Sequence, residues 1–345
     1  MTSSDRKRVE AAQRVAVLGG GAWGGTLAWL LTENGVDSVR LYRRPGAAFD
    51  NLLKSRELVD PLPVKLSEGC LITSDLGEAL EGAEIVILAC TSASMTNLLE
   101  QVHSVLAADS QGAQRIFVSV VKGLDPQSLK RMSEVANEIL GTDRVLSLSG
   151  PNLAFEIRSG LPCAAVVAHP DLALAQYVQH SLSTKSFRLY ASDDITGVEL
   201  GGTLKNVIAI AAGASDGLKL GVNAKSALLT RGLAEMVRLS ANLGARPNTL
   251  FGLSGMGDLI ATCQGPLSRN YRIGMYLAEN ASLDEALEKV GSVAEGVQTT
   301  DSVCELSKKL AIDLPIALQV QATLKGTTTP KDSIMTLMSR PLAKE

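Results

Sequence analysis

The sequence predicts a doubly wound, mostly parallel α/β domain followed by an all-α domain. Short β-rich runs alternate with helical patterns as far as residue 192, and long helical patterns replace them from residue 193 onward. Several runs, such as EIVILAC (84–90), are apolar throughout, which is typical of strands covered on both faces. The chain of 345 residues also exceeds the size at which a single core usually stops growing. We therefore expect two domains, 1–192 and 193–345.

The predicted strands are rich in β-branched and aliphatic residues. They are VAVLG (15–19), SVRLY (38–42), CLIT (70–73), EIVILAC (84–90), RIFVSVV (115–121), RVLSLS (144–149), CAAVVA (163–168) and FRLY (187–190). In the second half of the chain, apolar residues recur at helical spacing. This spacing predicts helices over 193–214, 223–243, 269–280, 295–310 and 313–325.

The composition predicts a soluble, cytoplasmic protein. A net charge of −3 gives no electrostatic reason to expect nucleic acid or an anionic membrane as a partner. The N-terminal segment has no apolar signal core, and the one uncharged run of membrane length, 15–32, contains five glycines that favour a strand, a turn and a helix over insertion in a membrane. Five irregularly spaced cysteines favour a reducing compartment, and with three histidines they form no metal-ligand pattern, so we expect no metal.

The stretch VAVLGGGAWGG (15–25) contains the pattern G-x-G-x-x-G at Gly19, Gly21 and Gly24, between a predicted strand and a predicted helix. The first glycine permits a tight turn, the second lets backbone N–H groups approach a pyrophosphate, and the third lets the helix pack close to the strand. The helix N-terminus adds a partial positive charge. The pattern predicts a Rossmann-like domain that binds a dinucleotide; the alternative is a glycine-rich turn that binds nothing.

The end of the second predicted strand bears on which dinucleotide is bound. An NAD-selective site usually carries Asp or Glu there, whereas this chain has Arg43 and Arg44. Two guanidinium groups could bind the 2′-phosphate of NADP, so NADPH is favoured over NADH. The alternative is that one or both arginines project into water.

Two turns at the carboxyl ends of later strands are candidate ligand sites. Lys122 follows RIFVSVV, at the sheet edge where open α/β sheets bind ligands, although a lysine there can also be solvated surface. Gly150-Pro151 follow RVLSLS. Because proline suits the first position of a helix, we expect free N–H groups from Asn152 to Ala154 that face a ligand; the alternative is a plain strand-to-helix turn.

Lys205 is the main candidate for the chemistry. It lies in ITGVELGGTLKNVIAIAAGA (195–214), a predicted helix that is apolar on every face and should be buried. A buried lysine costs free energy unless it is paired or functional, and desolvation favours its neutral form. Glu199 lies six residues earlier on a different face, so it is not assumed to be a partner. We interpret Lys205 as a general acid/base; the alternative is a lysine whose stem reaches the surface.

The segment SGMGDLIATCQGPLSRNYRIG (254–274) provides a third candidate cluster. Asp258 begins a predicted short helix, Ser268 is predicted to cap the next helix, and Arg269 offers a two-pronged donor for a phosphate. Taken alone, Arg269 also fits a surface charge and Asp258 a helix cap. Nothing near Cys263 indicates an activated thiolate, so we interpret it as a packing residue.

These segments together resemble one family. GGGAWGG, VSVVKGL, SGPNLAFEI, ELGGTLKNVIAIAAG, GMGDLIATCQGPLSRNYRIG and VAEGVQTT occur in the order and spacing of the bacterial-type NAD(P)-dependent glycerol-3-phosphate dehydrogenases, from about Val15 to Leu337. The resemblance implies an N-terminal Rossmann domain, a C-terminal α-helical domain and a homodimer. The implied reaction is the reversible reduction of dihydroxyacetone phosphate, a triose phosphate, by NAD(P)H to sn-glycerol 3-phosphate, which supplies phospholipid backbones.

The resemblance also implies roles for single residues. Lys205 would donate a proton to the C2 oxygen in reduction and accept it in oxidation. The implied substrate contacts are Lys122, Gly150, Asn152, Lys205, Asp258, Ser268, Arg269 and Asn270. The implied cofactor contacts, which include the three glycines of the loop, are Gly19, Gly21, Ala22, Trp23, Gly24, Arg43, Arg44, Lys122, Ala154, Arg269, Val293 and Glu295. Ala22 stands where many relatives have Ser, and Asn152 where Ser or Thr is common.

Two other functions fit parts of the sequence. A two-domain dehydrogenase for a hydroxy acid or a sugar nucleotide would need another anion site in place of Ser268-Arg269-Asn270. A non-catalytic dinucleotide sensor would keep the glycines but would have no need of a buried Lys205. The complete set of motifs favours a glycerol-3-phosphate dehydrogenase.

Overall fold

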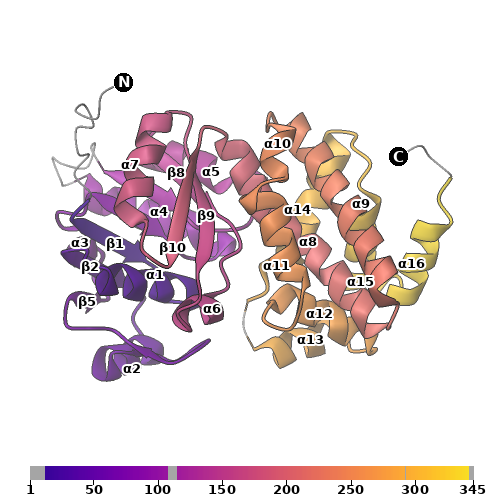
Figure 1. The fold of residues 1–345 in the computed structure, drawn as a ribbon, viewed down its shortest axis with the longest axis horizontal. Coiled ribbons are helices and arrows are strands. Elements are labelled where there is room, and N and C mark those ends of the chain that lie inside the picture. Colours follow the sequence, from indigo (N-terminus) through magenta and orange to yellow (C-terminus); the bar gives the residue numbers. More distant parts are fainter. Residues whose placement is uncertain (1–11, 108–114, 292, 342–345) are drawn as a thin grey trace.

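The computed structural model describes residues 12–107, 115–291 and 293–341, and it has an α/β part and an all-α part side by side (Figure 1). The predicted fold class is confirmed, because a sheet of mainly parallel strands is followed in the chain by helices alone. Residues 1–11, which carry most of the polar N-terminal segment, lie outside the described residues.

Eight strands form the main sheet in the order β10-β9-β8-β7-β6-β1-β2-β5. All eight predicted strands are present: β1 (Arg14–Leu18), β2 (Ser38–Tyr42), β5 (Cys70–Thr73), β6 (Ile85–Leu88), β7 (Ile116–Ser119), β8 (Val145–Ser149), β9 (Cys163–Ala168) and β10 (Phe187–Ser192). Neighbouring strands are parallel except β8 and β9, which pair antiparallel. The strand order reverses between β1 and β6, so the loop after β1 lies at the topological switch point, where such sheets bind ligands.

Helices cover both faces of this sheet. They are α1 (Ala22–Glu33), α2 (Ala47–Ser55), α3 (Leu76–Leu80), α4 (Ser92–Leu106), α5 (Met132–Leu140), α6 (Ala154–Arg158) and α7 (Leu172–Leu182). Alternate residues of β1 enter opposite cores: Val15 and Val17 pack with α1 and α7, and Ala16 and Leu18 with α3, α4 and α5. Burial on both faces explains why the strand runs are apolar throughout. The uncharged run 15–32 is strand, turn and helix, as predicted.

The all-α part contains the five predicted helices and several shorter segments. Its elements are α8 (Ile195–Gly217), α9 (Gly221–Asn242), α10 (Pro247–Leu250), the π-helical turn η2 (Leu253–Gly257), α11 (Asp258–Cys263), α12 (Arg269–Ala278), α13 (Leu283–Val290), α14 (Glu295–Lys309), α15 (Pro315–Leu324) and α16 (Pro330–Met338). α8 is the central helix and packs against α9, α11, α12 and α14. Within the described ranges, no helix has both the length and the apolarity needed to cross a bilayer.

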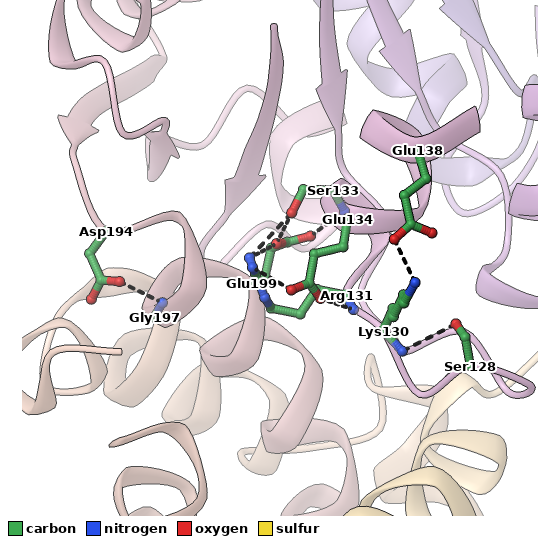
Figure 2. A network of polar contacts seen from close by, with 9 residues as sticks. All are labelled: Ser128, Lys130, Arg131, Ser133, Glu134, Glu138, Asp194, Gly197 and Glu199. Carbon is green, nitrogen blue, oxygen red and sulfur yellow. Dashed lines mark hydrogen bonds and ion pairs between the residues drawn. The ribbon is translucent and has the colours of Figure 1, made fainter. Parts of the chain in front are cut away.

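A buried ion pair joins α8 to the sheet domain. Figure 2 shows Glu199 of α8 beside Arg131 and Ser133 at the start of α5. The Glu199 carboxylate accepts hydrogen bonds from Nη1 of Arg131 at 2.8 Å and from the backbone N–H of Ser133 at 2.9 Å. Burial raises the pKa of Glu199, although Arg131 and Ser133 oppose that shift. Glu199 is therefore engaged away from Lys205, and it fixes α8 against the sheet fewer than two helical turns before that lysine.

Candidate active site

The ammonium of Lys205 is buried against a carboxylate. Its Nζ atom lies 2.8 Å from Oδ1 of Asp258 and donates a hydrogen bond to Oγ1 of Thr262 at 2.5 Å. Asp258 and Thr262 are one turn apart on α11, so both can face the same point of α8. The side chains of Lys205 and Asp258 are only 8% and 3% exposed. Burial lowers the pKa of Lys205 to about 8, the nearby charge of Lys122 lowers it as well, and Asp258 raises it.

A second lysine reaches the same carboxylate from the sheet domain. Nζ of Lys122, just beyond β7, lies 2.6 Å from Oδ2 of Asp258 and donates to the carbonyl of Gly150 at 2.9 Å. Asp258 is thus shared by two lysines, one from each part of the molecule. The alternative that it only caps a helix is wrong, because it lies inside the first turn of α11 with both carboxylate oxygens bound to ammonium groups.

The S-R-N sequence begins α12. Ser268 caps the helix as predicted, its hydroxyl accepting from the backbone N–H of Tyr271 at 3.2 Å. Asn270 is buried: it donates from Nδ2 to Oδ1 of Asn206 at 2.9 Å and accepts from the backbone N–H of Gly296 at 3.0 Å. Arg269 is an exposed residue whose guanidinium makes no hydrogen bond or ion pair with another described residue, so its donors are free for a ligand; partial desolvation lowers its pKa, and the nearby charge of Glu295 opposes that shift.

The start of α14 contacts the sheet domain. The Glu295 carboxylate accepts from the Ser92 hydroxyl at 2.5 Å and from the Ser92 backbone N–H at 3.2 Å. Ser92 is the first residue of α4 and follows the end of β6, where Ala89 packs against Gly19. Val293 lies just before α14 and is 55% exposed. The Ser92 contacts bring Glu295 to the carboxyl edge of the sheet, near the glycine loop.

The geometry of the glycine loop fits a dinucleotide. Gly21 is exposed, and a Cβ atom added there would meet no atom within 4 Å, so a ligand has open space above this backbone. α1 begins immediately after Gly21, with no side chain capping its N–H groups and no acid in its first turn. These N–H groups can therefore receive an anion. Gly19 has φ +133°, and Cβ atoms at Gly19 and Gly24 would lie 2.4 Å and 2.0 Å from backbone oxygens, so only glycine fits either position.

The residues on either side of this loop differ in how they are held. Ala22 and Trp23 begin α1, and the Trp23 ring packs edge-on against Phe187 with 6.2 Å between ring centroids. Nη1 of Arg43 donates to the Gly20 carbonyl at 2.6 Å, so Arg43 braces the loop. Arg44 is exposed and forms no hydrogen bond or ion pair within the described part of the chain. Arg44 is therefore the arginine that is free to bind a phosphate.

The turn after β8 differs from the prediction in one respect. α6 begins at Ala154 and not at Pro151, because Leu153 keeps an extended backbone with φ −78° and ψ 110°. Asn152 precedes the helix, and apart from a weak contact with the Cys163 thiol its buried amide atoms make no hydrogen bond among the described residues. A buried amide without a partner costs free energy, so Asn152 is suited to a polar ligand.

Some contacts at the site were missed from the sequence. Thr262 follows Asp258 by four residues, a helical spacing that could have indicated it. Asn206, next to Lys205, accepts from Asn270 and approaches the Lys122 carbonyl at 3.5 Å. The sequence around Ser92 contains no pattern that would have indicated its contact with Glu295. Cys263 is buried with its pKa raised to about 12, which confirms it as a packing residue. In the described ranges, no group of three His, Cys, Asp or Glu residues could hold a metal ion.

One part of the molecule carries a glycine loop at the switch point of its sheet, and the helical part carries a buried lysine–carboxylate cluster to which Lys122 of the sheet part is bonded. This is the plan of a two-domain nicotinamide-dependent dehydrogenase. Comparison with known proteins narrows this class. The family profile described as "NAD-dependent glycerol-3-phosphate dehydrogenase N-terminus" matches residues 14–175, and its C-terminal counterpart matches 194–335. The chain belongs to this family of oxidoreductases.

Individual relatives match over nearly their whole length. A protein of Synechococcus sp. strain JA-2-3B'a(2-13), named glycerol-3-phosphate dehydrogenase (NAD(P)+), is 44% identical over 100% of this chain and 99% of its own. A protein of Nitratidesulfovibrio vulgaris with the same name is 43% identical over 96% of this chain and 100% of its own. The crystal structure of glycerol-3-phosphate dehydrogenase from Coxiella burnetii has a TM-score of 0.88 and 35% identity, covering 95% of this chain and 99% of that one.

Proposed function

We propose that the protein catalyses the reversible reduction of dihydroxyacetone phosphate by NAD(P)H to sn-glycerol 3-phosphate, with Lys205 as the general acid/base and NADPH as the favoured cofactor. The observation that carries this proposal is the buried Lys205–Asp258 pair. An ammonium whose pKa burial lowers to about 8 can give up its proton near neutral pH, and it can still be protonated when the reaction begins. Family membership supports the same substrate.

We assign Lys205 as the donor of the proton that the C2 oxygen receives in the reduction. When bound, the reduced nicotinamide supplies the hydride that adds to C2 of the ketone. Lys205 donates its proton from Nζ to the C2 oxygen as negative charge develops there, and it becomes a neutral amine that regains a proton from solvent. Asp258 and Thr262 hold Nζ in place during this transfer. In the oxidation direction, the amine accepts the proton of the C2 hydroxyl.

The other residues of the site hold and orient the substrate. We assign Lys122, Gly150 and Asn152 to the triose portion, supported by the free amide of Asn152. The phosphate is assigned to Ser268, Arg269 and Asn270, supported by the free donors of Arg269. Asp258 keeps the two lysines directed toward the triose. Binding energy from the phosphate, remote from C2, is available to align the reacting carbon.

The cofactor is assigned to the sheet edge around the glycine loop. The proposed contacts are Gly19, Gly21, Ala22, Trp23, Gly24, Arg44, Lys122, Ala154, Arg269, Val293 and Glu295. Arg43 contributes to cofactor binding indirectly, because its hydrogen bond to the Gly20 carbonyl holds the glycine loop in place. The 2′-phosphate of NADPH is assigned to Arg44, because its guanidinium is exposed at the end of β2.

Three broader features complete the proposal. We place the boundary between the domains at residues 192 and 193, between the last strand and α8. We propose a homodimer that works in the cytoplasm without metal, nucleic acid or membrane insertion. Its product would supply backbones for glycerophospholipids. The family resemblance supports the dimer and the metabolic role.

One assay tests the proposed reaction. Purified protein is mixed with NADPH and dihydroxyacetone phosphate, and the absorbance of the reduced nicotinamide is followed. We expect rapid loss of absorbance with this substrate and little with dihydroxyacetone, which lacks the phosphate. Turnover of a 3-hydroxy acid or a sugar nucleotide with the oxidised cofactor instead would indicate a different dehydrogenase. Tight NADPH binding with no turnover of any of these would indicate a sensor.

A further inference from the structure

Arg158 is a buried arginine that the proposed reaction does not use. It is the last residue of α6 and only 5% exposed. Its guanidinium donates five hydrogen bonds, to Oγ1 of Thr26 at 2.7 Å and to the backbone carbonyls of Ala22 at 3.1 Å, Leu58 at 3.2 Å, Asp60 at 2.8 Å and Leu62 at 2.9 Å. No carboxylate forms an ion pair with it within the described residues. Burial lowers the pKa of Arg158 to about 10, so it stays charged at neutral pH.

Two of these acceptors belong to the first two turns of α1. Ala22 directly follows Gly21, whose open side faces the proposed dinucleotide, and Thr26 lies one turn further along the helix. The guanidinium therefore places a positive charge beside the first turn of α1, whose N–H groups are assigned to the pyrophosphate, and the nearby charge of Asp60 favours that charged form. This charge has the same sign as the partial charge of the helix N-terminus, so the two attract an anion together.

The other three acceptors belong to a hairpin that the sequence did not predict. Its strands are β3 (Glu57–Leu58) and β4 (Val64–Lys65), and Asp60 and Leu62 lie in the connection between them. The hairpin packs directly on α1, since a Cβ atom at Gly25 would lie 2.8 Å from the Leu58 side chain. The Arg158 side chain thus links this hairpin to α1 by hydrogen bonds, in addition to the contact between Leu58 and α1.

We propose that Arg158 is a positioning residue for the cofactor pyrophosphate: it fixes the first turn of α1 to the β3–β4 hairpin and adds positive charge beside the phosphate-binding N–H groups. This inference rests on the proposed function, because it takes the ligand of the glycine loop to be a dinucleotide. Arg158 bonds to the Ala22 carbonyl and the Thr26 hydroxyl and leaves the N–H groups of that turn free for the ligand, so its loss should weaken cofactor binding and leave the chemistry of the bound complex intact.

The test uses two variants. Arg158→Met removes the positive charge, and Arg158→Lys keeps the charge but replaces the planar guanidinium, which can bond to α1 and the hairpin at once, with a single ammonium group. The KM for NADPH and kcat are measured by the assay above, and the Kd of ADP-ribose and of adenosine 2′-monophosphate by calorimetry. ADP-ribose contains the pyrophosphate, whereas the monophosphate does not. We expect Arg158→Met to raise the KM for NADPH and the Kd of ADP-ribose about tenfold, because the first turn of α1 loses both its link to the hairpin and the positive charge beside its N–H groups. kcat and the Kd of the monophosphate should stay within about twofold, and Arg158→Lys should recover part of the loss.

Arg56 provides the matched control. It also donates to backbone carbonyls beside the hairpin, those of Leu66 at 3.2 Å and Cys70 at 2.6 Å, but makes no such bond to α1. Arg56→Met should leave the Kd of ADP-ribose unchanged. Four results would each overturn the inference. Both Arg158 variants could bind ADP-ribose with wild-type affinity, or the two nucleotides could lose affinity equally. Arg56→Met could show the same loss as Arg158→Met, or both Arg158 variants could fail to fold. Failure of the unmodified protein to bind ADP-ribose would instead contradict the proposed function.

Discussion

Nζ of Lys205 lies 2.8 Å from Oδ1 of Asp258, at a point where less than a tenth of either side chain is exposed. Because Lys122 also binds this carboxylate, at 2.6 Å, the cluster contains two ammonium groups and one carboxylate. One positive charge therefore remains uncompensated inside the cluster. Such a charge stabilises an alkoxide that develops beside it, in surroundings where electrostatic interactions are stronger than in water.

The pKa of Lys205 predicts opposite pH dependences for the two directions of the reaction. Reduction needs the ammonium, so kcat/KM for dihydroxyacetone phosphate should fall as the pH rises through about 8. Oxidation needs the amine, so kcat/KM for glycerol 3-phosphate should rise over the same interval. Initial rates measured between about pH 6 and pH 10 in both directions check this. Parallel profiles in the two directions would argue against a shared proton carrier.

Replacing Asp258 with Asn should move these profiles in a known direction. The carboxylate raises the pKa of Lys205, so without it the pKa should fall further below the ordinary value. The loss of reduction activity with rising pH should then begin at lower pH than in the unmodified protein. A control is Asp332→Asn, at an exposed position in the first turn of α16. A profile in Asp258→Asn that is unmoved, or moved to higher pH, contradicts the coupling.

Arg269→Ala should weaken transition-state binding of the phosphorylated substrate by about 1.5–3 kcal/mol, the range for hydrogen bonds to charged groups. The measurement is kcat/KM for dihydroxyacetone phosphate and for dihydroxyacetone. We expect a larger loss with the first than with the second, because only the first has a phosphate. Arg188→Ala, at an exposed position of β10, is the control. Equal losses for both substrates would remove Arg269 from the phosphate site.

The two arginines after β2 should have separable effects. Arg44→Ala should raise the KM for NADPH and spare NADH, because only NADPH carries the 2′-phosphate assigned to Arg44. Arg43→Ala should raise the KM for both cofactors, since its contact is with the Gly20 carbonyl of the shared loop. Steady-state kinetics with each cofactor distinguish the two. If Arg44→Ala raises the KM for NADH and for NADPH by the same factor, Arg44 does not bind the 2′-phosphate.

Two glycines of the loop give a contrast between binding and folding. A methyl group at Gly21 meets open space, so Gly21→Ala should keep the melting temperature while weakening NADPH binding through contact with the pyrophosphate. A methyl group at Gly24 would lie 2.0 Å from the Gly19 carbonyl, so Gly24→Ala should lower the melting temperature markedly. Thermal unfolding and NADPH titration measure both effects. Normal NADPH affinity in Gly21→Ala would place the cofactor elsewhere.

The sequence was sufficient for most of the fold because its signals are local. Strands buried on both faces have continuous apolar runs, and α8 is apolar on every side, so the burial of Lys205 could be predicted. The β3–β4 hairpin has strands of two residues, which are too short to show a periodic pattern. It is held by hydrogen bonds from Arg56 and Arg158 to backbone carbonyls, and those of Arg158 reach residues about a hundred positions away in the chain. The helix start at Ala154 depends on the backbone of Leu153, which proline statistics did not reveal.

The partners within the site could not be predicted from spacing alone. Asp258 is 53 residues from Lys205 and 136 from Lys122, and only packing of α8 and α11 against the sheet brings the three together. Glu295 meets Ser92 across 203 residues for the same reason. The resemblance to a family named most of these residues, but it did not indicate that Asp258 is shared between the lysines.

The most direct test of the account is the turnover of Lys205→Met with NADPH and dihydroxyacetone phosphate. Methionine fills the space of the lysine stem but carries no proton, so kcat should fall by roughly 10²–10⁴ while NADPH still binds. Lys309→Met, on the exposed side of α14, serves as the control and should keep normal turnover. A folded Lys205→Met protein with near-normal kcat would show that another group protonates the C2 oxygen.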